Sequence, residues 1–185
     1  MENTSGKQSQ SISLGQSRSY SILLEVLMLL GLGMLGIVLH ARLRLGLGIP
    51  GHHGVIFMAL ILAGRTSSKL PWAASISSLG VASLLFFPIL GFKDPFIALI
   101  YLLPGLTLDI FYRNQLHKTK MWYLVLIGGL AYMSIPLSRL FLHFSLHIPY
   151  MSFRHGYLTP ILTHFMFGGL GSLTALGIKH LLKKS

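Results

Sequence analysis

Imidazole and guanidinium groups are the side chains of this sequence best suited to chemistry, because histidine is frequent and acidic residues are rare. The chain of 185 residues has nine histidines, four acidic residues and no cysteine. Arg139, His143 and His147 recur every four residues, which places them on one face of a helix. An arginine in an apolar segment needs an anionic partner or water, so Arg139 is the strongest candidate for contacting a polar or anionic ligand.

Two other interpretations of these histidines stay open. In the first, the stripe lies at the level of the lipid headgroups, where basic side chains extend to the membrane interface. In the second, neutral imidazoles bind a transition metal or haem, with His143, His147 and His164 as ligands. His52 and His53 are adjacent, and on a helix they would point about 100° apart, which is weak evidence for a metal site.

The sequence excludes several catalytic classes. The absence of cysteine rules out thiolate catalysis and cysteine-type zinc sites, and the few carboxylates leave no acid–base pair. Asp109 and Arg113 lie four residues apart and predict a local ion pair, and Glu25 is expected to be neutralised by a neighbour or by protonation. No phosphate-binding Gly-x-x-x-x-Gly-Lys-Ser/Thr loop is present, so nucleotide hydrolysis would belong to another subunit. We therefore expect no enzyme activity and no cofactor.

These side chains lie in or beside long apolar segments, which indicate the fold class. Hydrophobic residues make up 52% of the chain and charged residues only 10%. The segments predict an all-α membrane protein, a bundle of six transmembrane helices in which the second helix is short or broken. The predicted spans are about 20–39, 45–64, 72–92, 95–112, 121–144 and 158–182. Residues 1–19 are expected to be a disordered cytoplasmic tail, and residues 183–185 a basic C-terminus.

Irregularities within the spans predict local structure. Residues 49–54 (IPGHHG) should break the second span, leaving 55–64 as its regular part, and would form either a loop over or lining a pocket or a plain extracellular loop. A kink is expected at residues 104–105 (PG). Small residues at helical spacing predict close helix packing first and partner docking second: Ala74, Ser78 and Ala82 in the third span, and Gly168, Gly171, Ser172 and Ala175 in the sixth.

The distribution of basic residues predicts the orientation. With both termini in the cytoplasm, the outer side holds only the smaller set of basic residues, namely Arg42, Arg44, Lys93, Arg139 and Arg154. The formal net charge of +11 then reflects segments that face anionic lipid, and nucleic acid is not an expected partner. We expect a multi-pass protein of the bacterial inner (cytoplasmic) membrane whose outer side is rich in imidazole.

The chain resembles the S component, the substrate-binding membrane subunit, of energy-coupling factor (ECF) transporters. The resemblance covers residues 20–182 and lies in the six short spans, the irregular segment 48–54 (GIPGHHG) and the string GLTLD at 105–109. It implies uptake of a small polar nutrient, such as a vitamin or its precursor, and partners comprising a transmembrane coupling protein and two ATPase subunits. By position it implies a ligand site made of His52, His53, Tyr101, Tyr132, Arg139, His143 and His164.

The first span departs from this family. Where the family often has a spaced pair of alanines that dock the coupling protein, this chain has Gly31, Gly33 and Gly36, which would offer an alternative surface for close approach. A histidine-rich transition-metal transporter or a haem- or metal-binding membrane protein is the alternative function. A scaffold subunit without a ligand is a third.

Overall fold

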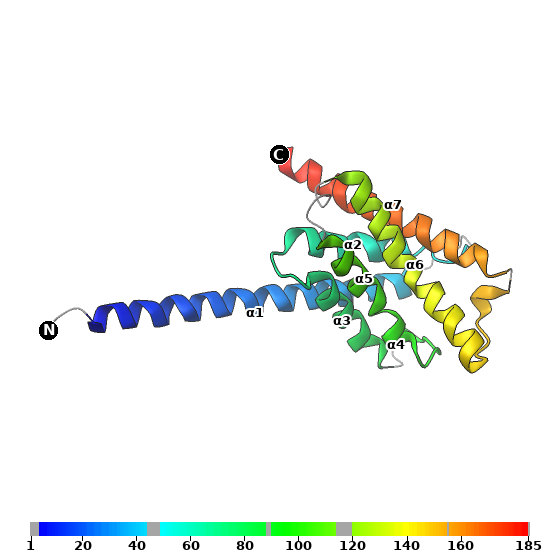
Figure 1. Ribbon diagram of the computed structural model, residues 1–185, viewed down its shortest axis with the longest axis horizontal. Coiled ribbons are helices and arrows are strands. Elements are labelled where there is room, and N and C mark those ends of the chain that lie inside the picture. Colours follow the sequence, from blue (N-terminus) through cyan, green and yellow to red (C-terminus); the bar gives the residue numbers. More distant parts are fainter. Residues whose placement is uncertain (1–3, 44–48, 88–89, 114–119, 155, 185) are drawn as a thin grey trace.

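The protein is described by a computed structural model that covers residues 4–43, 49–87, 90–113, 120–154 and 156–184 (Figure 1). All regular elements in these residues are helical. The elements are α1 (Thr4–Arg42), α2 (Gly54–Ser67), α3 (Ala73–Leu85), α4 (Ile97–Ile100), α5 (Leu103–Tyr112), α6 (Met121–Leu146), the 3-10 turn η2 (Met151–Phe153) and α7 (Leu158–Lys184).

Three of the helical segments are long and apolar enough to cross a membrane: Ser19–Arg42, Met121–Leu146 and Leu158–Leu182. The other helices are shorter, with 14 residues in α2, 13 in α3 and 10 in α5. At 1.5 Å per residue, α2 is about 21 Å long, less than the hydrocarbon thickness of roughly 30 Å. The helical class and three membrane-compatible helices are thus found, while the six full crossings stay a prediction.

Successive helices run back and forth along the bundle (Figure 1), so residues from different helices meet at its two ends. At one end, here called the Asp109 end, Arg65 of α2 pairs with Asp109 of α5, and Lys179 of α7 donates a hydrogen bond to the Thr66 carbonyl. At the opposite end, here called the His40 end, the last turn of α1 lies beside α4, and the connections from α1 to α2 and from α3 to α4 approach each other. Residues distant in sequence therefore meet at both ends.

The start of the first helix and the break in the fourth span differ from the prediction. The first helix begins at Thr4, where a disordered tail was expected over residues 1–19, and this extension projects beyond the other helices (Figure 1). Once a long apolar helix exists, each added residue gains a backbone hydrogen bond without a new nucleation cost. The break in the fourth span falls at residues 101–102, before the predicted kink, because Pro104 occupies the first turn of α5, where a missing N–H is tolerated.

The helices of the second and third spans also have limits that differ from the predicted ones. Helix α2 starts at Gly54, directly after the IPGHHG segment, so the predicted break is confirmed, and its regular part extends to Ser67. Helix α3 ends at Leu85, several residues before the predicted limit of 92. Pro88, Gly91 and Pro95 disfavour continuation of that helix.

Close helix packing uses the small residues that the sequence singles out. A methyl group added at Gly105 of α5 would collide with Ser78 and with the Ala74 carbonyl of α3. A methyl group at Gly128 of α6 would likewise meet Ser172 of α7. These stripes therefore pack helices against one another, as predicted, because only small side chains allow backbones to approach so closely.

Candidate ligand-binding site

Three histidines from two segments meet at the His40 end. The rings of His52 and His53 have centroids 3.7 Å apart, and the His53 ring lies 5.0 Å from that of His40 at the end of α1. The Phe92 ring lies 6.1 Å from His40 on the connection between α3 and α4. The predicted pair His52 and His53 is thus brought into the bundle by contact with a third imidazole.

Aromatic rings continue this contact from His40 into the core. The Tyr101 hydroxyl lies 3.3 Å from Nε2 of His40, and the Tyr101 ring packs edge-on against Phe57 at 5.5 Å. Phe57 lies 5.9 Å from Tyr132, whose ring stacks on His164 at 4.8 Å and 27°. Tyr132 is fully buried, and Tyr101 and His164 are nearly so. We call this set, with His52 and His53, the His40 cluster.

Glycines allow the segment before α2 to lie against this cluster. Gly51 has φ +83°, a conformation that side-chain-bearing residues adopt at a cost, and a Cβ there would lie 2.7 Å from Nδ1 of His164. A Cβ at Gly54 would overlap the Tyr132 ring. His52 turns its Nδ1 toward the Ile49 carbonyl at 2.6 Å, which fixes the turn locally. The contacts from His52 through His40, Tyr101 and Tyr132 to His164 therefore return to the same segment at Gly51.

Arg139 of α6 pairs with a carboxylate on the connection between α3 and α4, the same connection that brings Phe92 to His40. Its Nε lies 3.4 Å from Oδ2 of Asp94, and the two side chains are only 19% and 13% exposed. Asp94 also accepts hydrogen bonds from the Phe96 N–H at 3.0 Å and from the Tyr150 hydroxyl at 3.5 Å. The predicted requirement of Arg139 for an anionic partner is met within the chain.

Tyr150 lies on the connection between α6 and α7. Its ring lies 5.6 Å from the Arg139 guanidinium carbon, within the range of a cation–π contact. Burial, followed by the negative charge of Asp94, raises the pKa of the Tyr150 phenol above its ordinary value of 10.0. The phenol therefore stays protonated and acts as a hydrogen-bond donor toward Asp94.

Two imidazoles of the cluster each have a buried ring nitrogen without a hydrogen-bond partner among the described residues. These atoms are Nδ1 of His40 and Nε2 of His52. A buried polar atom without a partner costs free energy, and such atoms are often satisfied by water, an ion or a ligand. Both atoms belong to imidazoles, which can donate or accept a hydrogen bond.

His143 does not join the cluster, in contrast to the prediction. Its Nδ1 lies 2.8 Å from the Ile148 carbonyl, and its Nε2 lies 3.4 Å from the Tyr157 hydroxyl. His147 lies just past α6 with φ 54° and is exposed. The stripe of Arg139, His143 and His147 therefore does not act as one face: His147 lies beyond Leu146, the last residue of α6, and His143 contacts the connection that follows the helix.

The metal alternative finds no assembled ligand set. Within the described ranges, no group of three or more His, Cys, Asp or Glu side chains is placed to hold a metal ion. His143 contacts the connection before α7, whereas His164 stacks on Tyr132, so the two occupy different surroundings.

Sequence reasoning missed His40 and Asp94. His40 is the residue through which the histidine pair meets Tyr101, and Asp94 neutralises Arg139. The position of His40 at the end of the first span, on the same side as His52 and His53, was the available signal. No signal in the sequence pointed to Asp94, because its partner Arg139 lies 45 residues later on another helix.

The ion pair predicted between Asp109 and Arg113 is wrong. Asp109 is fully buried and pairs with Arg65 of α2 at 2.9 Å. It also accepts hydrogen bonds from the N–H groups of Ala74 and Ser75 and from the Ser75 hydroxyl, at 2.7 to 3.2 Å. Arg113 is exposed and lies over the Trp72 ring instead. A carboxylate inside a bundle takes the partner that is buried with it.

No protein-family model, curated protein sequence or solved structure matches this chain.

Proposed function

We propose that this protein is the substrate-binding membrane subunit of an ECF-type uptake transporter, and that its ligand is a small polar nutrient such as a vitamin or its precursor. The observation that carries the proposal is the convergence of His40, His52 and Tyr101 from three separate segments on one end of the bundle, where the Arg139–Asp94 pair also lies. Few polar groups in an otherwise apolar surrounding are typical of a selective binding site.

The chemistry of the cluster defines the ligand. Aromatic rings offer stacking surfaces. Because Nδ1 of His52 donates to the Ile49 carbonyl, Nε2 of the neutral ring offers an acceptor, whereas Nδ1 of His40 can donate or accept according to its tautomer. Because Asp94 already balances Arg139, the pair can bind a neutral or zwitterionic polar molecule without burying net charge. A planar, polar, heteroaromatic compound fits these requirements better than a simple anion.

The proposed orientation places the His40 end outside. Both tryptophans lie at the opposite, Asp109 end, where Trp72 and Trp122 are exposed, as are Lys69, Arg113 and Lys120. Tryptophans with neighbouring lysines and arginines are typical of the cytoplasmic interface of a membrane. The ligand would then enter from the extracellular or periplasmic side.

Docking of a coupling protein would not use the glycines of the first span as expected. Gly33 packs tightly against the Ser77 carbonyl of α3, and Gly36 contacts Phe57 and Leu60 of α2, which leaves Gly31 on the open side of α1. In the proposed transporter, the coupling protein and two ATPase subunits would therefore contact other surfaces.

The ligand site is tested by mass spectrometry of small molecules retained through purification. We expect wild type to retain a polar heteroaromatic compound, and His40→Gln, Tyr101→Phe and Arg139→Gln to bind it roughly tenfold or more weakly, as loss of a buried hydrogen bond implies. His143→Gln is the matched control, because it lies on the same helix but outside the cluster. Equal binding by all four variants would contradict the site.

Orientation and partners have separate tests. Because the chain has no cysteine, a single cysteine at position 93 or 69 can be labelled cleanly. A membrane-impermeant reagent should modify Lys93→Cys in intact cells, and Lys69→Cys only after permeabilisation; the reverse pattern would overturn the orientation. Purification from native membranes should recover two ATPase subunits, whereas a solitary chain that retains its ligand would overturn the ECF assignment alone.

A further inference from the structure

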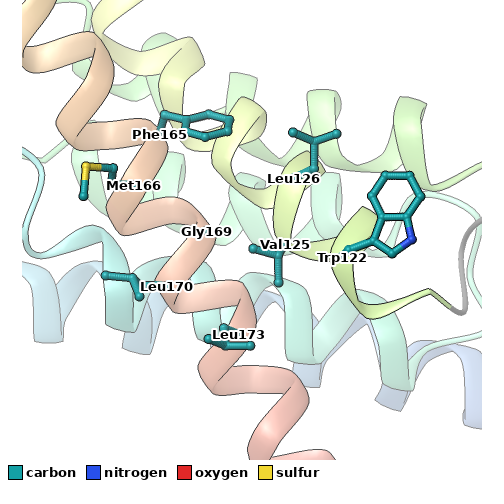
Figure 2. Close-up of a pocket in the computed structure, with 8 residues that line it drawn as sticks. All are labelled: Trp122, Val125, Leu126, Phe165, Met166, Gly169, Leu170 and Leu173. Carbon is teal, nitrogen blue, oxygen red and sulfur yellow. The ribbon is translucent and has the colours of Figure 1, made fainter.

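Two grooves of similar size open on the outer surface of the bundle. One lies between α6 and α7, has a volume of ≈ 490 Å³ and is lined only by uncharged residues, among them Trp122, Val125 and Phe165 (Figure 2). The other lies between α1 and α2 and has a volume of ≈ 480 Å³. The first groove is almost wholly apolar, whereas the second has a polar part with serines and a carboxylate.

That carboxylate belongs to Glu25, the only ionisable side chain among the described residues that line the α1–α2 groove. Its Oε1 accepts a hydrogen bond of 2.6 Å from the Ser68 hydroxyl and one of 3.2 Å from the Lys69 N–H. Both donors share one oxygen, so the carboxylate retains the capacity to accept hydrogen bonds at Oε2. Ser21 and Ser67 line the same part of the groove.

The polar part of the groove lies at the Asp109 end, and its apolar part extends toward the middle of the bundle. Glu25 is level with the connection between α2 and α3, whereas Leu32 lies two helical turns further along α1. Trp72 is exposed at this end, as expected for the depth of lipid headgroups. The groove therefore matches the polarity of a phospholipid, which has a polar headgroup at one end and apolar acyl chains at the other.

Charges of both signs flank the polar part. Lys69 is exposed and its backbone bonds directly to Glu25, so its flexible ammonium group can reach a phosphate beside the carboxylate. Glu25 suits a cationic group that donates hydrogen bonds. A primary ammonium has three N–H donors, whereas a quaternary choline has none.

We propose that the α1–α2 groove is a binding site for a phospholipid with an ethanolamine headgroup, whose ammonium binds Glu25 and whose phosphate binds Lys69. One acyl chain would lie along Leu29 and Leu32 of α1 and Ala63 of α2. Glycerol and choline headgroups fit less well, because the first has no cation for Glu25 and the second cannot donate a hydrogen bond to it. The proposal requires only that the chain lies in a membrane and is independent of the ligand site at the His40 end.

The experiment uses the full chain in nanodiscs that contain equal parts of ethanolamine, choline and glycerol phospholipids with identical acyl chains. After detergent release, native mass spectrometry counts the lipids that stay bound. Wild type should retain the ethanolamine lipid roughly tenfold over the choline lipid, the effect of one charge-assisted hydrogen bond. Equal retention of the two lipids, or a preference for the glycerol lipid, would overturn the proposal.

Variants assign the preference to this groove. Glu25→Gln keeps an oxygen that can accept from Ser68 but removes the charge, so it should reduce the ethanolamine preference to near unity while the protein stays folded. Lys69→Ala removes the proposed partner of the lipid phosphate, so it should lower the retention of every phospholipid that binds in this groove. Leu126→Trp is the matched control, since it fills the uncharged α6–α7 groove (Figure 2) and should leave the headgroup preference unchanged. Persistence of the preference in Glu25→Gln would contradict the assignment.

Discussion

Each end of the bundle pairs an arginine with an aspartate, but the surroundings of the two pairs differ. At the Asp109 end, the carboxylate is fully buried and Arg65 is held by the Leu70 carbonyl at 3.0 Å and by the Tyr112 ring at 4.1 Å. At the His40 end, Arg139 and Asp94 are 3.4 Å apart and partly exposed. The first pair is the more deeply buried of the two, and its arginine has further contacts from α5 and from the connection after α2.

The comparison distinguishes a structural ion pair from the pair that we propose to be available for binding. A buried charge that already has its full set of partners has nothing to offer a ligand, and removing one partner destabilises the fold. The Arg139 pair instead borders a cluster in which buried ring nitrogens lack partners. We therefore expect the Arg139–Asp94 pair, and not the Arg65–Asp109 pair, to border a ligand site.

The largest expected effect concerns the two aspartates. Asp109→Asn leaves the Arg65 charge buried and unpaired, which should lower the free energy of unfolding by about 3–5 kcal/mol. Asp94→Asn removes a longer and more exposed contact and should cost only about 1 kcal/mol. Denaturant unfolding in detergent micelles measures both. Equal losses would show that the two ends do not differ in this way.

A smaller effect should distinguish two glycines with similar backbone geometry. Gly51 and Gly91 have φ +83° and +75°, so alanine at either position should cost about 1–2 kcal/mol of strain. Only Gly51 lies against His164, whereas a Cβ at Gly91 meets nothing within 4 Å. Gly51→Ala should therefore also weaken ligand binding, and Gly91→Ala should not. Binding isotherms of the two variants test this, and equal binding would exclude the Gly51 contact from the site.

The smallest effect is a pH dependence at the His40 end. Because the pKa of Tyr150 is raised in the folded protein, the folded state holds its proton more tightly than the unfolded state, whose phenol titrates near pH 10.0. The stabilisation is complete below that pH and is lost as pH rises through the higher folded pKa. The thermal unfolding temperature of wild type should therefore decrease more steeply above pH 10 than the unfolding temperature of Tyr150→Phe. Parallel curves would contradict the raised pKa.

Much of the helical framework could be predicted because it follows from local chemistry. The break before Gly54, the start of α6 at Met121 and the start of α7 at Leu158 agree with the sequence. The lengths of α1 and α3 could not be predicted in the same way. Polar residues after Thr4 gave no apolar signal, and the apolar residues after Leu85 gave a misleading one.

The candidate site could likewise be predicted only in part. Periodicity placed Arg139 and His143 on one face of α6, but His143 lies one turn nearer the helix end and contacts the connection to α7, whereas Arg139 pairs with Asp94. His52, His53, Tyr101, Tyr132 and His164 do come together, and His40 completes their contacts.

The sequence by itself determined an apolar helical chain, the glycines at which helices approach closely, and the scarcity of carboxylates. These depend on residue type and spacing, which act within a few turns of one helix. Tertiary structure alone decided that Asp109 pairs with Arg65 and that Asp94 pairs with Arg139. A charge buried in a low-dielectric interior takes whichever opposite charge is buried beside it, and only the packing of the helices fixes which one that is.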